Sequence, residues 1–117
     1  MVVAAAREIH DGEMVFVGMR LPLLGFAVAK ELHAPRSIGI FENGVIRDRP
    51  ALESIFTISD PPNVARALYC GGVLDVMSLL QSGQVDLGFI GGAEVDRFGN
   101  LNTHWVEESG KKIRLPG

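Results

Sequence analysis

Apolar residues along the chain gather into short runs that end at glycine or at turn-forming residues. Three continuous apolar runs predict strands that are covered on both faces of a parallel sheet, at residues 14–17, 37–41 and 85–90. Apolar positions repeated at helical spacing predict three helices, over residues 2–10, 21–33 and 73–81. This alternation of strands and helices indicates an α/β domain.

The segments between these runs are less regular. Residues 47–63 carry three prolines and mixed charge, so we expect an irregular excursion, with Asp60 or Asn63 near the cap of a helix that continues through Arg66 to Tyr69. The alternation over residues 93–105, with a Phe-Gly-Asn turn, predicts a hairpin-like segment. The last residues, GKKIRLPG, follow a loop without a closing helix or strand, so we expect one domain over residues 1–117 that is truncated at its carboxyl end.

Composition narrows the class of protein. The chain has 117 residues, 47% of them apolar, which suits one domain with a real core. Its net charge of -3 and its scattered basic residues argue against a nucleic-acid partner. The longest apolar stretch, residues 21–29, is interrupted by proline and glycine and is too short to cross a membrane. A single cysteine, Cys70, allows no internal disulfide and fits a reducing cytoplasm.

Glu42 is the strongest candidate for chemistry. It directly follows the predicted strand over residues 37–41, and ligands of open α/β sheets bind at the carboxyl ends of strands. Gly44 lets the backbone turn sharply, so that the carboxylate can face a cleft with walls of low dielectric constant. The alternative is that Glu42 caps a turn on the solvated surface.

Other candidates are weaker on the same grounds. The three histidines lie far apart in sequence and are typical of helix-end or surface residues: His10, His33 and His104. A free cysteine is more often buried than nucleophilic, so we expect Cys70 to be buried. Gly71 and Gly72 open neither a dinucleotide-binding nor an ATP-binding pattern. No Cys/His cluster has zinc spacing, and no metal site is expected.

Two motifs in this order carry a family resemblance. FENG at 41–44 and GGAEVDRFGNLN at 91–102, with VGxxLPxxGxxVAKxLxAP at 17–35, resemble the β half of family I coenzyme A transferases, in particular the β subunit of glutaconate CoA-transferase. In that family the glutamate of the Glu-Ser/Asn-Gly turn is the nucleophile. The resemblance covers nearly the whole chain. Two positions depart from the family pattern, since Arg20 stands where glycine is frequent and Glu94 where glutamine is usual.

The resemblance implies a fold and a reaction. The fold would be the three-layer αβα type with a mostly parallel sheet that CoA transferases share with sugar-phosphate isomerases (NagB/RpiA-like). The chain would be a β subunit, or a fragment of one, that completes its site against an α subunit within an oligomer. CoA would move between an acyl-CoA and a carboxylic acid through a glutamyl-CoA thioester at Glu42, with CoA as a substrate and no permanently bound cofactor.

Supporting residues follow from the same motifs. Asn43 and Gly44 would support the turn that presents Glu42. The backbone N–H groups of Gly91, Gly92 and Ala93, at the end of a strand, are candidates for an oxyanion hole that stabilises charge developing on oxygen. The alternative for this glycine pair is a tight turn needed only for packing.

Two rival functions stay open at this point. One is a relative of the same fold that hydrolyses CoA thioesters or opens a ring, and the presence of Glu42 argues against it. The other is a non-catalytic fragment or partner that keeps the fold. The sequence leaves open the acyl group, the acceptor acid and the size of the oligomer.

Overall fold

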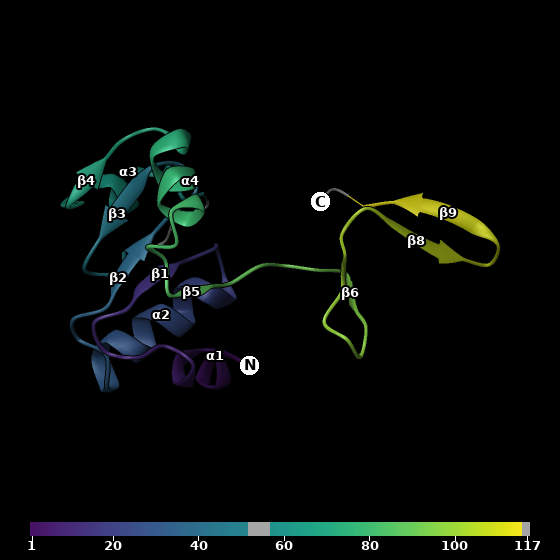
Figure 1. Cartoon of the computed structure of the whole chain (residues 1–117), viewed down its shortest axis with the longest axis horizontal. Coiled ribbons are helices and arrows are strands. Elements are labelled where there is room, and N and C mark those ends of the chain that lie inside the picture. The colour runs from purple at the N-terminus through teal and green to yellow at the C-terminus, as the bar shows by residue number, and fades with distance from the viewer. Residues whose placement is uncertain (52–56, 116–117) are drawn as a thin grey trace.

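The computed structural model describes residues 1–51 and 57–115 of the chain (Figure 1). Four helices are described: α1 (Val2–Arg7), α2 (Leu21–Leu32), α3 (Pro61–Val64) and α4 (Val73–Gln81). Nine short strands are described: β1 (Met14–Phe16), β2 (Ile38–Ile40), β3 (Val45–Arg47), β4 (Tyr69–Cys70), β5 (Leu87–Gly88), β6 (Glu94–Val95), β7 (Leu101–Asn102), β8 (Trp105–Glu108) and β9 (Lys111–Arg114). The three strands predicted from apolar runs and the three helices predicted from helical spacing are confirmed, with equal or shorter bounds.

The first five strands form one mixed sheet in the order β4-β3-β2-β1-β5. β1 lies at its parallel centre, between β2 and β5, whereas β3 and β4 continue the sheet with antiparallel pairing. In Figure 1, α1 and α2 lie on one side of this sheet and α4 on the other. This arrangement confirms the predicted αβα class, and the antiparallel edge is the part that the apolar runs did not predict.

The core forms where α2 packs on the centre of the sheet. Phe26 of α2 is fully buried, and its ring lies so close to Gly39 of β2 that a Cβ at that glycine would come within 2.9 Å of Phe26 Cε1. α1 packs on α2 in turn, and the side chain of His33 ties the two helices together, with Nε2 at 3.0 Å from the carbonyl oxygens of Ala6 and Ile9. The structure therefore gives His33 a structural role.

Two parts of the predicted secondary structure are wrong. The predicted helix through Tyr69 ends early, because α3 stops at Val64 and Arg66 takes a left-handed backbone conformation with φ of 59°. The chain then returns to the sheet, where the Leu68 N–H donates to the Ile46 carbonyl and Tyr69 joins β4. Residues 111–114, where we expected no closing helix or strand, form the strand β9. Part of the expected excursion, residues 52–56, lies outside the described residues.

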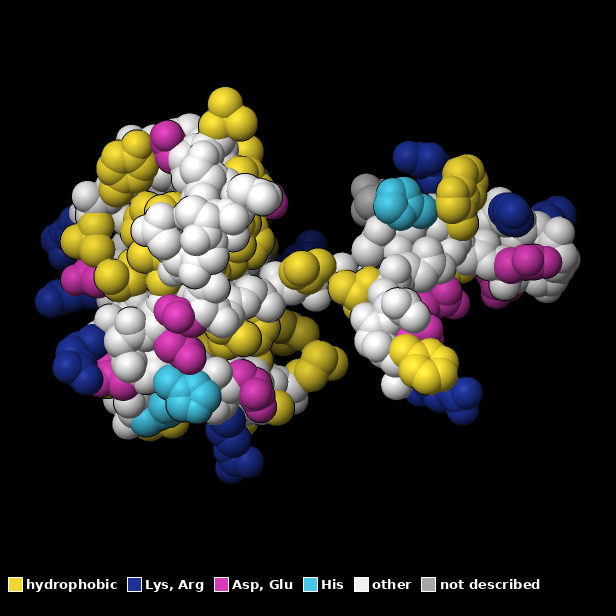
Figure 2. Space-filling view, viewed as in Figure 1, with side chains coloured by type: hydrophobic (Ala, Val, Ile, Leu, Met, Phe, Trp, Pro, Cys, Tyr) yellow, Lys and Arg dark blue, Asp and Glu magenta, His cyan; other side chains and the backbone are white. Residues whose placement is uncertain are grey.

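Residues 91–115 form an arm that extends from the αβα body (Figure 1). The arm holds two hairpins, β6–β7 and β8–β9, which pair only within themselves. The radius of gyration is 15.4 Å, compared with about 13 Å for a compact domain of this length. Hydrophobic side chains cover parts of the arm's surface, including Phe98 at 76% and Trp105 at 47% exposure (Figure 2). Within the described part of the chain, no helix has the length and apolar character that a membrane span needs.

Candidate active site

Glu42 sits in a tight turn that links β2 to β3. Phe41, just before it, is fully buried and anchors the turn to the core. Two hydrogen bonds close the turn: the Phe41 N–H donates to the Val45 carbonyl at 2.9 Å, and the Gly44 N–H donates to the Phe41 carbonyl at 3.0 Å. Gly44 has a φ of +95°, a conformation that L side chains rarely adopt. The turn therefore requires glycine at this position.

The turn also contacts another stretch of backbone at very short range. The Gly71 N–H donates to the Gly44 carbonyl at 2.9 Å, and a Cβ built on Gly44 would lie only 2.2 Å from the Gly71 carbonyl oxygen. Gly71 lies between β4 and α4, so this contact ties the turn of Glu42 to the edge of the sheet. The sequence showed no nucleotide-binding pattern at Gly71 and Gly72, and it gave no sign of this packing role.

Asn43 braces the turn from its other side. Its Oδ1 accepts a hydrogen bond from the Val45 N–H at 3.3 Å, and its Nδ2 donates to the Ile58 carbonyl at 2.8 Å and to Ser59 Oγ at 3.2 Å. The amide therefore joins the turn to a segment that is distant in sequence. Asn43 and Gly44 both hold the backbone around Glu42, by hydrogen bonding and by conformation respectively.

Glu42 lines a cavity of about 260 Å³ at the carboxyl ends of the parallel strands. The other walls are mostly apolar and come from the ends of β1 and β5 and from one distant residue: Phe16, Val17, Gly18, Met19, Phe89, Ile90, Gly91 and Ile58. The residue Glu42 is itself exposed to solvent. The cavity thus brings a carboxylate to the end of the sheet where ligands of α/β proteins bind.

The three predicted oxyanion donors differ in their positions and hydrogen bonds. Gly91 lines the same cavity as Glu42, whereas Gly92 and Ala93 are not among its lining residues. The Ala93 N–H donates to the Asn102 carbonyl at 2.9 Å, next to the β6–β7 pairing, so it is occupied and cannot also serve an oxyanion here. No hydrogen bond to another described residue uses the N–H of Gly91 or Gly92. Of these two N–H groups, that of Gly91 belongs to a residue that lines the cavity, and that of Gly92 follows it directly in the chain.

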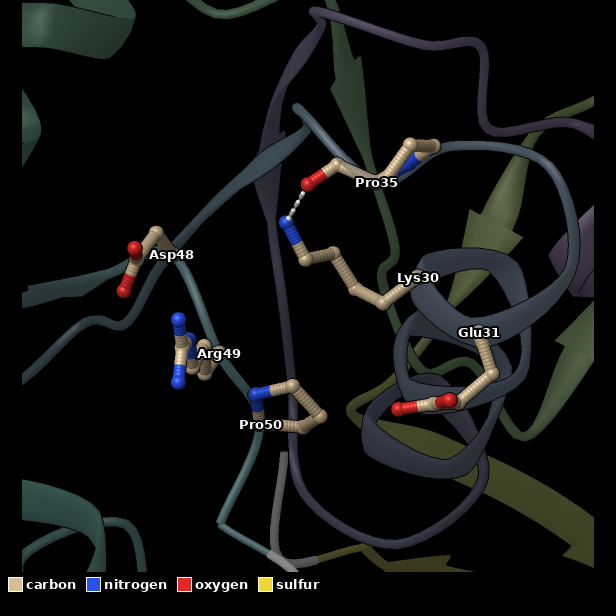
Figure 3. Close-up of a pocket in the computed structure, with 6 residues that line it drawn as sticks. All are labelled: Lys30, Glu31, Pro35, Asp48, Arg49 and Pro50. Atoms are coloured by element: carbon tan, nitrogen blue, oxygen red, sulfur yellow. Dashed lines mark hydrogen bonds between the residues drawn. The ribbon is translucent and has the colours of Figure 1, made fainter.

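A second, larger cavity of about 400 Å³ lies away from Glu42 (Figure 3). It is lined by two cations and two anions with two prolines: Lys30, Arg49, Glu31, Asp48, Pro35 and Pro50. Lys30 Nζ donates to the Pro35 carbonyl, drawn in Figure 3, and to the Ser37 carbonyl at 2.8 Å. Burial lowers the pKa of this amine. The lysine holds the loop after α2. The carboxylates of Glu31 and Asp48 lie away from the carboxyl ends of the parallel strands, so the size of this cavity does not make it the active site.

The remaining candidates lie outside the Glu42 cavity. Cys70 is exposed rather than buried as expected, because β4 is the edge strand of the sheet. His10 is exposed, and its Nδ1 lies 3.2 Å from Glu13 Oε1. His104 is an exposed residue of the arm. Among the described residues, no three His, Cys, Asp or Glu side chains gather to hold a metal ion. Of the residues that the structure describes, Glu42 is the carboxylate that lines the mostly apolar cavity at the strand ends.

Comparison with known proteins gives the context for this site. The family model described as Coenzyme A transferase matches residues 1–117. The chain belongs to the coenzyme A transferase family. It is 37% identical over 119 residues to the B-type subunit of the 3-oxoadipate CoA-transferase of Pseudomonas knackmussii, a match that covers 100% of this chain and 45% of that protein. It is 32% identical over 109 residues to the B-type subunit of the glutaconate CoA-transferase of Acidaminococcus fermentans, covering 86% of this chain and 40% of that protein.

Solved structures share the fold. The crystal structure of the decarboxylase AibA/AibB matches with a TM-score of 0.83 and 28% identity, covering 99% of this chain and 49% of that one. The chain thus spans less than half the length of the proteins it matches. The names of these relatives include transferases and a decarboxylase, so a choice between activities must rest on the residues of the site.

Proposed function

We propose that this chain supplies the nucleophile of a CoA-transferase, and that Glu42 carries CoA as a thioester between donor and acceptor. The observation that supports the proposal is the place of Glu42, in a glycine-dependent turn at the rim of an apolar cavity at the carboxyl ends of β1, β2 and β5. Membership of the coenzyme A transferase family and the two CoA-transferase relatives point to the same reaction.

Each step of the proposed reaction balances without an added cofactor. A Glu42 carboxylate oxygen attacks the acyl-CoA carbonyl, and the carbon–sulfur bond breaks to give a mixed anhydride and CoA thiolate. The thiolate then attacks the glutamyl carbon, and the acyl group leaves as a carboxylate. An acceptor carboxylate reverses these two steps, so that it leaves as the new CoA thioester and Glu42 is regenerated. Covalent catalysis of this kind replaces one difficult transfer by several easier ones.

The main-chain donors beside the cavity suit the charge that develops. Each attack builds negative charge on a carbonyl oxygen, and preorganised N–H donors stabilise such charge. In our proposal the N–H groups of Gly91 and Gly92 serve this purpose, because the Ala93 N–H is already bonded to Asn102. The substrates are an acyl-CoA and a carboxylic acid. An α-type subunit supplies the wall that covers the exposed side of Glu42.

Chemical trapping tests the role of Glu42. The assembled enzyme, incubated with acyl-CoA and then with borohydride, should carry a reduced side chain at Glu42 that mass spectrometry locates. Glu42→Gln keeps the size of the side chain but removes the carboxylate nucleophile, so transfer should fall by about 10³-fold or more, the range seen when a covalent nucleophile is lost. Glu31→Gln is the matched control, because Glu31 lines the other cavity, and this variant should transfer CoA at the normal rate.

Kinetics separate transfer from its alternatives. A covalent CoA intermediate predicts ping-pong kinetics, with parallel lines when donor and acceptor are varied. Turnover with water alone at the rate of the acid acceptor would instead show a thioester hydrolase, and release of carbon dioxide without an acceptor would show a decarboxylase. Full transfer activity in Glu42→Gln, or a label on another residue, would refute the proposal.

A further inference from the structure

One wall of the Glu42 cavity comes from outside the sheet. Ile58 lies in a short turn over residues 57–60 and lines the cavity together with Glu42. The turn is closed by its own hydrogen bonds: the Asp60 N–H donates to the Thr57 carbonyl at 3.2 Å, and Asp60 Oδ1 accepts from Thr57 Oγ1 at 3.0 Å. The position of Ile58 is therefore built into a defined local structure.

Two asparagine side chains converge on the backbone of Ile58. Asn43 Nδ2 donates to the Ile58 carbonyl at 2.8 Å, and Asn63 Nδ2 donates to the same oxygen at 2.6 Å. Asn63 is fully buried, and its own carbonyl accepts a hydrogen bond from the Arg47 guanidinium of β3. A carbonyl oxygen has two lone pairs, and both are used here. Ile58 is thus fixed both to the residue after the nucleophile and to the sheet.

The side chain of Ile58 suits a wall that selects by shape. It is partly buried and packs against the hydrophobic core, so one side of it is held while another faces the cavity. A β-branched side chain has little freedom at χ1, so it does not move aside easily for a larger ligand. The neighbouring walls are mostly apolar residues at and just after the ends of β1 and β5, and Glu42 is the one carboxylate among the described residues that line this cavity.

We infer that Ile58 is a specificity-determining residue, which limits the length of the aliphatic acyl chain that the cavity accepts, and that Asn43 and Asn63 are its positioning residues. This inference rests on the proposed function of the cavity. The donor carbonyl must reach Glu42, so the carbons beyond that carbonyl must fit against the remaining walls. Shortening Ile58 therefore makes room for a longer chain, and enlarging it removes room.

The test compares acyl-CoA donors of increasing straight-chain length on the assembled enzyme. Ile58→Ala should shift the preferred donor to longer chains and Ile58→Phe to shorter ones. The ratio of kcat/KM values between a long and a short donor should change by about tenfold or more, since one methylene in an apolar pocket changes kcat/KM by roughly 10- to 200-fold. Val3→Ala is the control, because Val3 is exposed on α1, and it should leave the ratio unchanged.

The positioning residues have a separate readout. Asn63→Asp retains the size of the side chain but replaces the amide donor by an acceptor, so Ile58 loses one of its two restraints. This variant should broaden the chain-length profile without moving its optimum, whereas general damage to the fold would lower kcat/KM equally for every donor. An equal loss for every donor would refute the positioning role.

Two outcomes separate this inference from the proposed function. If Glu42→Gln abolishes transfer but neither Ile58 variant changes the donor ratio, the transferase stands and the inference fails. If the enzyme transfers no CoA, calorimetric titration with the same acyl-CoA series still measures the chain-length preference for binding. A preference that Ile58→Ala shifts to longer chains would then support the role of Ile58, and an unchanged preference would refute it.

Discussion

Replacing Gly44 by alanine tests whether the turn of Glu42 depends on the close approach of two backbones. The structure predicts two separate costs. The φ of +95° disfavours any L side chain, which costs about 1–2 kcal/mol. The new Cβ would also lie 2.2 Å from the Gly71 carbonyl oxygen, and this overlap adds about 1–3 kcal/mol, since backbone cannot move aside as a side chain can. We therefore expect Gly44→Ala to destabilise the protein by about 2–5 kcal/mol.

Gly12→Ala provides a matched control for the first cost. Gly12 has a φ of +90°, but apart from its two neighbours in the chain no residue places a heavy atom within 4 Å of the position that its Cβ would take. Gly12→Ala should therefore lower the free energy of unfolding only by the backbone contribution of about 1–2 kcal/mol. The difference between the two variants isolates the contact between Gly44 and Gly71, and urea denaturation followed by circular dichroism measures both free energies of unfolding.

Activity provides a second measure of the same perturbation. The overlap is relieved only if the backbones of Gly44 and Gly71 move apart, and Glu42 lies two residues from the substituted position. A displacement of about 1 Å can reduce a rate by roughly 100-fold, so Gly44→Ala should lose much of the borohydride-trapped intermediate while Gly12→Ala retains it. Equal destabilisation of the two variants, with full trapping in both, would contradict the role of close packing.

Three other features of the structure each give a prediction. Arg20 has a φ of 64° and is exposed, so Arg20→Gly should relieve strain and raise the free energy of unfolding by about 1 kcal/mol in urea denaturation. The side-chain hydrogen bond from Asn100 holds the pKa of Asp96 below its ordinary value of 3.8. Asp96 therefore stabilises the β6–β7 turn above pH 3.8, and this contribution is lost as the pH falls through the lower, folded-state pKa. NMR titration should show the turn loosening in that pH range, and Asp96→Asn should remove the pH dependence. Exposed apolar residues on the arm favour association, so light scattering should show that the 117-residue chain self-associates without its partner. The double variant Phe98→Ser, Trp105→Ser should shift the chain to monomer.

The parallel centre of the fold could be predicted from the sequence because each of its elements has a strong local signal. The run over residues 14–17 ends at Gly18, and the spacing of apolar residues after Pro22 predicted α2 nearly to its last residue. β3 and β4 lack such a signal. Each has two or three residues, and their pairing of Ile46 with Tyr69 joins segments that are 23 positions apart. Such pairing depends on tertiary context, which the local pattern does not contain.

The candidate site was predicted in part for similar reasons. Glu42 could be found because a motif and a strand end coincide at one position. Ile58 could not, because it reaches the cavity through a turn held by Asn43 and Asn63, and hydrogen bonds across distant segments leave no periodic pattern. The sequence also could not show which of the N–H groups of Gly91, Gly92 and Ala93 are free of hydrogen bonds within the described chain. The bond from the Ala93 N–H to the Asn102 carbonyl depends on the register of β6 with β7.

The exposure of Glu42 bears on how the proposed reaction can proceed. Water stabilises a carboxylate, and this hydration must be replaced as the oxygen attacks a thioester. The described walls of the cavity are mostly apolar but leave Glu42 open to solvent on one side. A bound acyl-CoA and an α-type subunit would close that side, and they would strengthen the interaction between the developing oxyanion and the N–H groups of Gly91 and Gly92. In the proposed reaction, Glu42 would therefore become reactive only in the assembled, substrate-bound enzyme, and this would limit wasteful hydrolysis of the thioester.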